Sequence, residues 1–147
     1  MTASSPERRR LRDLGITVGR LPTGKLNAIT DVAGVRVGHA TVWRDSPRVS
    51  RTGVTAILPR AVAEMGRPLF AGTHRLNGNG ELTGLEWIRE SGFLTTPICL
   101  TNTHSVGVVH DEMIRWSLDN VPGTPPWSLP VVGETWDGVL NDVNGFH

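Results

Sequence analysis

The sequence is short of cysteine, of tyrosine and of long apolar runs. It contains one cysteine, Cys99, and no tyrosine, and no apolar run reaches the ~18 residues that a membrane-spanning helix needs. A single cysteine excludes an internal disulfide framework and fits a reducing compartment. The N-terminal residues also lack the apolar core of a secretory signal peptide. These absences predict a cytoplasmic protein with no membrane partner.

A strong excess of charge is absent as well. The chain has 15 Lys and Arg residues against 14 Asp and Glu, so its net charge of +1 does not favour nucleic acid as a partner. One basic cluster, Arg8-Arg9-Arg10 with Arg12, suits either a targeting or nucleic-acid-binding arm or a solvated terminus. Because polar termini are commonly solvated, we interpret residues 1–20 as a tail. Residues 21–147 then have the length of one domain.

Signatures of a metal site or of a nucleophile are also missing. No two histidines have the H-x-x-x-H spacing with an accompanying acid that zinc helices use, so we predict no metal and no cofactor. Ser105 lacks the G-x-S-x-G context of a hydrolase, and a helix-capping role suits it better. Cys99 lies in an apolar segment and fits a small core residue. The histidines are interpreted as surface or capping residues: His39, His74, His104, His110 and His147.

The apolar pattern predicts four strands and two helices. Apolar residues at alternate positions, or in short runs closed by Gly or Pro, indicate strands, and spacings of three and four indicate helices. The strands span residues 35–42, 53–59, 96–101 and 129–134, and the helices span residues 81–92 and 106–120. The first two strands can form a hairpin with a long connection, and residues 61–73 are irregular. The order β-β-α-β-α-β is that of a mixed α/β fold, with Trp87 and Trp116 as core residues on the helices.

A glycine-rich loop, Asn77-Gly-Asn-Gly80, precedes the first predicted helix. Helix N-termini bind anions, so this loop resembles a phosphate cradle. It lacks the lysine of a P-loop and the spacing of a dinucleotide fingerprint, which disfavours phosphate. Asn77, Asn79 and Glu81 remain candidates for the lining of a pocket.

The most polar stretch of the chain follows the last predicted strand. Three acids, Glu134, Asp137 and Asp142, lie here between glycines, and Trp136 stands among them. A strand that ends in a polar, glycine-punctuated loop commonly builds a site in an α/β protein. Trp136 can wall a pocket beside an acid, which makes Glu134, Trp136 and Asp137 candidates for substrate binding. The alternative is that these acids bond only the turn backbone, and for Asp142 that alternative is at least as good.

Five stretches of the chain resemble the N-terminal part of the P1 aminopeptidases. This family is also called peptidase S58, the group of the L-aminopeptidase D-Ala-esterase/amidases and β-peptidyl aminopeptidases. The similar stretches are Leu26–His39, Arg51–Pro59, Asn77–Gly84 with Trp87, Leu100–Gly107, and Glu134–His147. Several long motifs in the same order make the resemblance specific. It covers residues 21–147, the portion that corresponds to the α chain of the family.

The resemblance implies a fold and a reaction. The fold is part of an αββα sandwich like that of the N-terminal-nucleophile hydrolases, with different strand connectivity. Family precursors cut themselves, and the cut exposes an N-terminal Ser or Thr that attacks the substrate carbonyl. That nucleophile is expected outside this chain, so no residue here is assigned as catalytic. The implied activity is that of an aminopeptidase that releases N-terminal residues from peptides, amides or esters.

The resemblance also assigns roles and partners. Glu134 matches the acid that holds the free ammonium of the substrate, a peptide or amino-acid amide. Trp136 stands where some members carry a tyrosine that helps the oxyanion; because indole has one N–H and no hydroxyl, it is better interpreted as a pocket wall. The expected partners are a C-terminal β part and further copies, in a homotetramer of αβ pairs.

Two other functions stay open at this stage. Ornithine acetyltransferases share the general fold and self-cleavage, so acyl transfer is one alternative. A truncated, non-catalytic remnant is the other. The stretch Asn77-Gly-Asn-Gly-Glu81 favours the peptidase over the acyltransferase.

Overall fold

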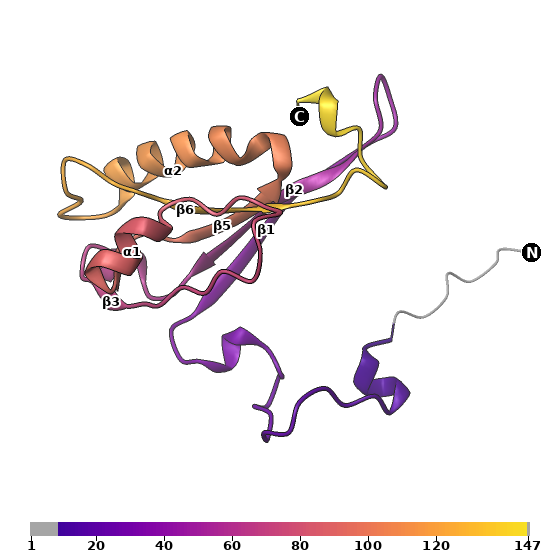
Figure 1. The fold of residues 1–147 in the computed structure, drawn as a ribbon, viewed down its shortest axis with the longest axis horizontal. Helices are drawn as coiled ribbons and strands as arrows, with labels where there is room; N and C mark the ends of the chain where they lie inside the picture. Colours follow the sequence, from indigo (N-terminus) through magenta and orange to yellow (C-terminus); the bar gives the residue numbers. More distant parts are fainter. Residues whose placement is uncertain (1–8, 147) are drawn as a thin grey trace, which may run out of the picture.

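A four-stranded sheet with one long helix on its face forms the body of the protein (Figure 1). The structure, a computed structural model, describes residues 9–146, so His147 and residues 1–8 of the predicted tail, with Arg8 of the basic cluster, lie outside the described residues. The strands are β1 Arg36–Arg44, β2 Ser50–Leu58, β3 Leu69–Phe70, β4 Phe93–Leu94, β5 Ile98–Asn102 and β6 Val131–Thr135, and the helices are α1 Leu85–Ser91 and α2 Val106–Asn120. Short 3-10 turns lie at Leu11–Leu14, Ile29–Asp31, Val62–Glu64, Thr103–Ser105 and Val143–Gly145.

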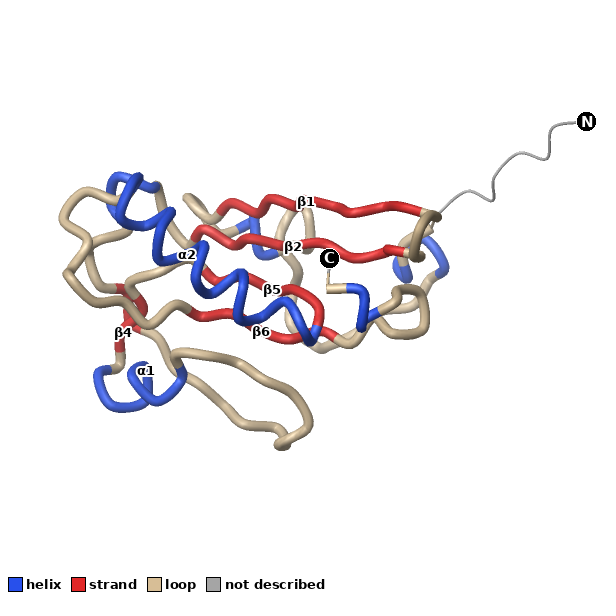
Figure 2. Tube along the Cα trace, turned by 90° about the horizontal axis from the view of Figure 1, so that it is seen from above, coloured by secondary structure: helices blue, strands red, loops and turns tan. Residues whose placement is uncertain are grey.

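The strand order of the sheet is β1-β2-β5-β6. Strands β1 and β2 form the predicted hairpin, antiparallel from Arg36 opposite Leu58 to Arg44 opposite Ser50. Strand β5 is antiparallel to β2 and parallel to β6, and α2 provides the crossover between β5 and β6. Figure 2 shows α2 lying along the sheet above β5 and β6. The prediction of a mixed α/β fold is confirmed.

The main core lies between α2 and the sheet. Cys99 of β5 and Val132 of β6 pack against Val106 and Met113, which lie two turns apart on one face of α2. Cys99 is 6% exposed, which confirms the prediction of a small core residue, and burial raises the pKa of its thiol. A second cluster joins α1 to the sheet through Ile88, Leu94 and Val131.

The predicted start of α1 is wrong. We expected a helix from residue 81, but α1 begins at Leu85, after Gly84 in a left-handed conformation with φ +72°. Residues 81–83 instead run beside β6: Thr83 N donates to Val132 O (3.0 Å), and Glu134 N donates to Glu81 O (2.8 Å). These backbone bonds cover the outer edge of β6, so Glu81 precedes the helix and does not lie in its first turn.

Other differences from the predicted elements are small. The segment 61–73 was expected to be irregular, yet it contains β3, which pairs with β4 just after α1. Two-residue strands carry no periodicity that a sequence pattern can show. Trp87 and Trp116 are half-buried, not core residues. Trp87 packs edge-on against Trp127, with ring centroids 5.1 Å apart, and so lies under the loop before β6.

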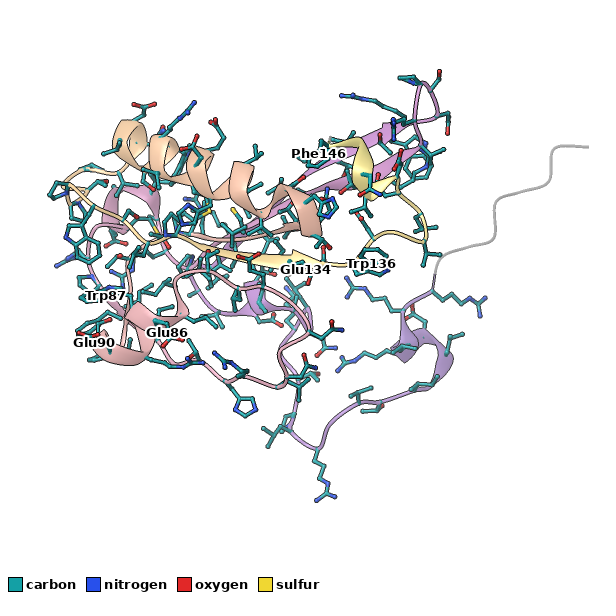
Figure 3. All side chains as sticks on the ribbon, turned by 45° about the horizontal axis from the view of Figure 1, so that its top comes forward. Glu86, Trp87, Glu90, Glu134, Trp136 and Phe146 are labelled. Carbon is teal, nitrogen blue, oxygen red and sulfur yellow. The ribbon has the colours of Figure 1, made fainter. Side chains whose placement is uncertain are left out.

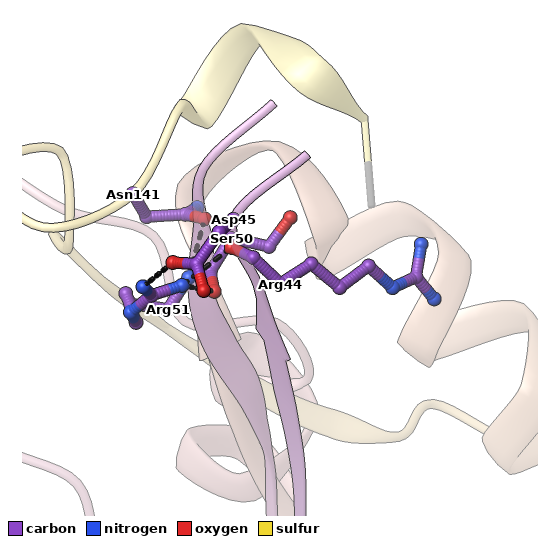
Figure 4. Close-up of polar contacts among 5 residues, drawn as sticks. All are labelled: Arg44, Asp45, Ser50, Arg51 and Asn141. Carbon is purple, nitrogen blue, oxygen red and sulfur yellow. Dashed lines mark hydrogen bonds and ion pairs between the residues drawn. The ribbon is translucent and has the colours of Figure 1, made fainter. Parts of the chain in front are cut away.

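The C-terminal segment is tied to the turn of the β1-β2 hairpin, as Figure 4 shows. The backbone N–H of Arg51 donates to Asn141 Oδ1 (3.0 Å), and its guanidinium bonds Asp45 and the carbonyls of Arg44 and Ser50. The guanidinium carbon also lies 4.1 Å from the centroid of the Trp43 ring. The bond to Asn141 holds the C-terminal segment beside the hairpin, while the guanidinium contacts fix Arg51 within the hairpin turn.

Within residues 9–146, no helix combines the length and the apolar character that crossing a bilayer requires.

Acidification is expected to loosen the turn around Asp31. The Asp31 carboxylate accepts bonds from Leu26 N (2.9 Å) and Ala28 N (3.1 Å), which hold its pKa below the usual value. A folded-state pKa below the unfolded one adds stability above the unfolded pKa of ~3.9, and this stability is lost as pH falls through the folded pKa. The amide NMR shifts of Leu26 and Ala28 should therefore titrate below the ordinary Asp range. They should lose this titration in Asp31→Asn, and a midpoint at or above the ordinary value would contradict the expectation.

Candidate functional site

The candidate site lies where two parallel strands end at the same edge of the sheet. Thr101 of β5 is in register with Glu134 of β6, and both strands run toward this edge. Ligands commonly bind outside the carboxyl ends of parallel strands, because the loops that follow the strands meet there. The residues just beyond the register pair therefore share one small region.

Glu134 is the acid at this edge. Its side chain is half-buried, and its Oε1 accepts a hydrogen bond from the Thr103 hydroxyl at 2.7 Å. Its Oε2 lies against Gly80, where an added Cβ would come within 3.1 Å. The carboxylate thus has one oxygen held by a hydroxyl and the other bordered by glycine backbone. Such a group suits a cationic ligand, since charge-assisted hydrogen bonds are the strong ones.

The Glu134 side chain opens onto a hollow of about 490 Å³. Figure 3 shows Glu134 and Trp136 near the end of β6, far from Glu86 and Glu90 on α1. Trp136 is 68% exposed, and its indole lies against Gly138, where any Cβ would clash with the ring. The residues that line the hollow are Asn79, Gly80, Glu81, Thr103, Glu134 and Trp136.

The glycine-rich loop separates this hollow from a second one. The second hollow has a volume of about 520 Å³ and is bordered by residues 74–82, Leu85 and Glu134. Asn77 lines only this second hollow, and its Oδ1 accepts from Asn79 N at 2.9 Å, which fixes the turn. Asn79 and Glu81 border both hollows. The structure therefore brings both halves of the sequence-derived candidates, the loop and the end of β6, to one place.

Asp137 and Asp142 lie elsewhere. Asp137 lines a different hollow, of about 380 Å³, over β1 and β2, and its Oδ1 accepts from Asn141 Nδ2 at 3.3 Å. Asp142 Oδ2 accepts from Arg48 Nη1 at 2.6 Å, and Asp142 N donates to Val49 O. These contacts serve the turn and the hairpin. The structure does not bring Asp137 to the hollow that Glu134 lines.

The turn after β5 is capped by the side chain of Asn102. Asn102 Oδ1 accepts from the backbone N–H groups of His104 and Ser105, each at 3.1 Å. Ser105 occupies the N-cap position of α2, but its side chain makes no capping hydrogen bond there, so the predicted capping by its hydroxyl is wrong. In the part of the chain that the structure describes, no group of three His, Cys, Asp or Glu residues could hold a metal ion.

Thr103 is the site residue that the sequence did not single out. The usable signal was its place immediately after β5, because parallel strand ends meet at one edge and Glu134 ends the next strand. Its neighbour His104 packs against the C-terminal segment instead, stacked on Phe146 with ring centroids 5.5 Å apart.

Comparisons with known proteins identify the family of the chain. A family model described as peptidase family S58 matches residues 27–147. The chain is 47% identical over 152 residues to the "Beta-peptidyl aminopeptidase BapA" of Sphingosinicella microcystinivorans, covering 99% of this chain and 37% of that protein. The chain therefore spans well under half the length of that relative.

Solved structures give the same result for the fold. A Burkholderia sp. β-aminopeptidase superposes with a TM-score of 0.86 at 56% identity, over 95% of this chain and 40% of that one. The L-aminopeptidase D-Ala-esterase/amidase of Ochrobactrum anthropi, described as a new variant among the Ntn hydrolase fold, gives 0.85 at 46% identity, over 95% and 41%. The predicted relation to the fold of the N-terminal-nucleophile hydrolases is confirmed. With the family model matching most of its length, the chain belongs to peptidase family S58.

Proposed function

We propose that this chain forms the amine-recognition part of an aminopeptidase. The proposed enzyme releases N-terminal residues from peptides, amides or esters, and Glu134 holds the free ammonium of the substrate. The observation that carries the proposal is the half-buried Glu134 carboxylate at the edge of a hollow that Trp136 walls. An aminopeptidase must recognise a cation at a fixed distance from the bond that it cuts, and an oriented carboxylate can do so.

The roles of the other site residues follow from their places. Trp136 offers an apolar wall to the substrate side chain. Asn79 and Glu81, on the glycine-rich loop, border the same hollow and contribute polar groups. Asn77 remains a candidate pocket residue, because it lines the second hollow that Glu134 also borders, and its side chain fixes the loop turn. Asp137 lines the hollow over β1 and β2 and bonds Asn141 in the C-terminal turn, so a contact with the same substrate is less direct. The site needs no metal and no cofactor for this recognition role.

The reaction itself is proposed to depend on residues outside these 147. The relatives named aminopeptidases are longer, and this chain spans 37% and 40% of two of them. By family resemblance the nucleophile is a Ser or Thr made N-terminal by self-processing. The resemblance also suggests cytoplasmic location and a homotetramer of αβ pairs. The large apolar side chains of residues 9–35 support assembly with further protein, since Val18, Leu21 and Val32 are each more than 60% exposed.

Replacing Glu134 by Gln tests the recognition role. The chain is co-expressed with the part of the Burkholderia sp. β-aminopeptidase that it does not cover and is assayed on β-alanyl p-nitroanilide. Because charge-assisted contacts are worth ~1.5–3 kcal/mol, Glu134→Gln should lower kcat/KM by about ten- to a hundredfold. The loss should be much smaller on the N-acetylated substrate, which cannot make the contact.

The matched control is Glu90→Gln, which removes an exposed acid from α1, away from the hollow (Figure 3). It should leave both substrates unaffected. Equal losses on the free and acetylated substrates in Glu134→Gln would mean that Glu134 serves the fold or the chemical step, and the recognition role would be abandoned.

A further inference from the structure

The Thr103 hydroxyl and the Glu134 carboxylate form a short side-chain hydrogen bond at the candidate site. The distance from Thr103 Oγ1 to Glu134 Oε1 is 2.7 Å, and the contact joins the loop after β5 to the end of β6. A hydroxyl can donate only one proton. The Thr103 proton is therefore committed to the carboxylate, which has further lone pairs to offer a ligand.

The position of Thr103 is itself strongly fixed. Thr103 is the first residue of the 3-10 turn Thr103–Ser105, which the buried Asn102 side chain caps through the N–H groups of His104 and Ser105. Asn102 Nδ2 in turn donates to Thr52 Oγ1 on β2 at 3.0 Å. This network anchors Thr103 to the central strands. Its hydroxyl therefore keeps a fixed position and can orient a neighbouring side chain.

The opposite side of the carboxylate is bounded by Gly80. An added Cβ at this position would lie 3.1 Å from Glu134 Oε2, closer than ordinary van der Waals contact. The glycine backbone thus leaves the carboxylate just enough room, while the Thr103 hydroxyl fixes its other oxygen. A glutamate side chain has several rotatable bonds, and these two contacts select one arrangement among its rotamers.

We propose that Thr103 is a positioning residue for amine recognition, acting through Glu134. The hydroxyl holds Oε1, so the Glu134 carboxylate is already oriented before the substrate binds. The substrate ammonium then does not have to restrict the rotamers of Glu134 on binding. Preorganisation of this kind raises affinity by removing an ordering cost from the binding step. The inference rests on the proposed function of Glu134 and adds Thr103 as the residue that orients its carboxylate.

Thr103→Val tests the proposal because valine keeps the shape of threonine and removes the hydroxyl. In the co-expressed protein described above, Thr103→Val should lower kcat/KM on β-alanyl p-nitroanilide by about tenfold, mainly through a higher KM. The N-acetylated substrate should be unaffected, and Thr103→Ser should restore the rate. The matched control is Thr135→Val, which removes a hydroxyl that bonds Thr101 O at 3.0 Å and should leave the preference for the free amine unchanged.

A double-mutant cycle separates positioning from a general effect on the fold. If Thr103 acts through Glu134, Thr103→Val should cost nothing further in a Glu134→Gln background. Additive losses, or equal losses on both substrates, would overturn the proposal.

A measurement without catalysis distinguishes failure of this inference from failure of the proposed function. The Hβ–Hγ couplings of Glu134 in the 147-residue chain should report one rotamer in the unchanged chain and in Thr103→Ser, and averaging in Thr103→Val. A single rotamer in Thr103→Val would overturn the positioning role whatever the activity. If the rotamers behave as expected but the free amine is not preferred, the proposed function fails and the role of Thr103 in amine recognition fails with it.

Discussion

The 147-residue chain alone is expected to hydrolyse amino-acyl p-nitroanilides no faster than a protein-free blank. Removing a catalytic nucleophile typically costs many orders of magnitude in rate, and the nucleophile of this family is expected outside the chain. Cys99 and Ser105, the candidate nucleophiles considered from the sequence, are poorly placed. Cys99 lies in the core, where burial raises the pKa of its thiol and disfavours the reactive thiolate. Ser105 is 8% exposed, under the start of α2.

Adding the missing part of the enzyme should restore the hydrolysis of p-nitroanilides. Co-expression with the remaining part of the Burkholderia sp. β-aminopeptidase, whose structure matches this chain with a TM-score of 0.86, should give turnover far above the blank. The two halves are purified together and assayed on free and N-acetylated β-alanyl p-nitroanilide. A complex that forms but shows no turnover would favour the alternative of a non-catalytic remnant.

One pair in the chain needs its own control in this assay. The Thr55 hydroxyl lies 2.9 Å from His39 Nδ1, across the β1-β2 hairpin, and a hydroxyl beside an imidazole is the usual arrangement for nucleophilic catalysis. Any turnover by the chain alone should therefore be compared with Thr55→Val. Turnover by the unchanged chain that disappears in Thr55→Val would contradict the expectation that the chain alone is inactive. It would assign the nucleophile to the Thr55–His39 pair.

The long elements could be predicted because their patterns follow from burial. The apolar residues of α2 recur at helical spacing since one face covers the sheet, and the predicted helix 106–120 matches Val106–Asn120. In the β1-β2 hairpin, Val37 pairs with Ile57 and His39 with Thr55, on the face opposite to Val54 and Ala56, which pack against the core under α2. The alternation therefore predicted the strand, but not which of its faces α2 covers. Strand β5 could be predicted from its apolar run. The run arises because β5 lies inside the sheet, between β2 and β6.

The contacts of the candidate site could not be predicted from the sequence in the same way. Thr103 contacts Glu134 only because β5 and β6 are parallel neighbours in register. No local sequence pattern predicts that strand pairing. The same holds for residues 81–83, which look like the start of a helix but bond the edge of β6 because Gly84 turns the chain first. Asp137 is close to Glu134 in sequence, yet side chains alternate along this extended segment, so Glu134 and Trp136 line one hollow and Thr135 and Asp137 line another. Tertiary pairing decided each of these cases over local preference.

Gly84→Ala is expected to destabilise the protein strongly. Gly84 has φ +72°, a left-handed conformation that costs roughly 1–2 kcal/mol for a residue with a Cβ. Its Cβ would also lie 2.8 Å from Leu129 O and 3.0 Å from Pro130 O. These are backbone atoms at the entrance to β6, so no side chain can rotate away, and the clash should add a further ~1–3 kcal/mol.

The matched control is Gly92→Ala at the other end of α1. Gly92 has nearly the same backbone conformation, φ +74°, but no atom lies within 4 Å of its added Cβ. Gly92→Ala therefore measures the left-handed cost alone, about 1–2 kcal/mol. Urea unfolding of the two variants, followed by tryptophan fluorescence, should show Gly84→Ala as the less stable by the cost of the clash. Equal losses would mean that the loop before β6 moves aside freely. In that case Gly84 would not fix the position of residues 81–83 on the edge of β6, nor that of Glu81 beside the candidate site.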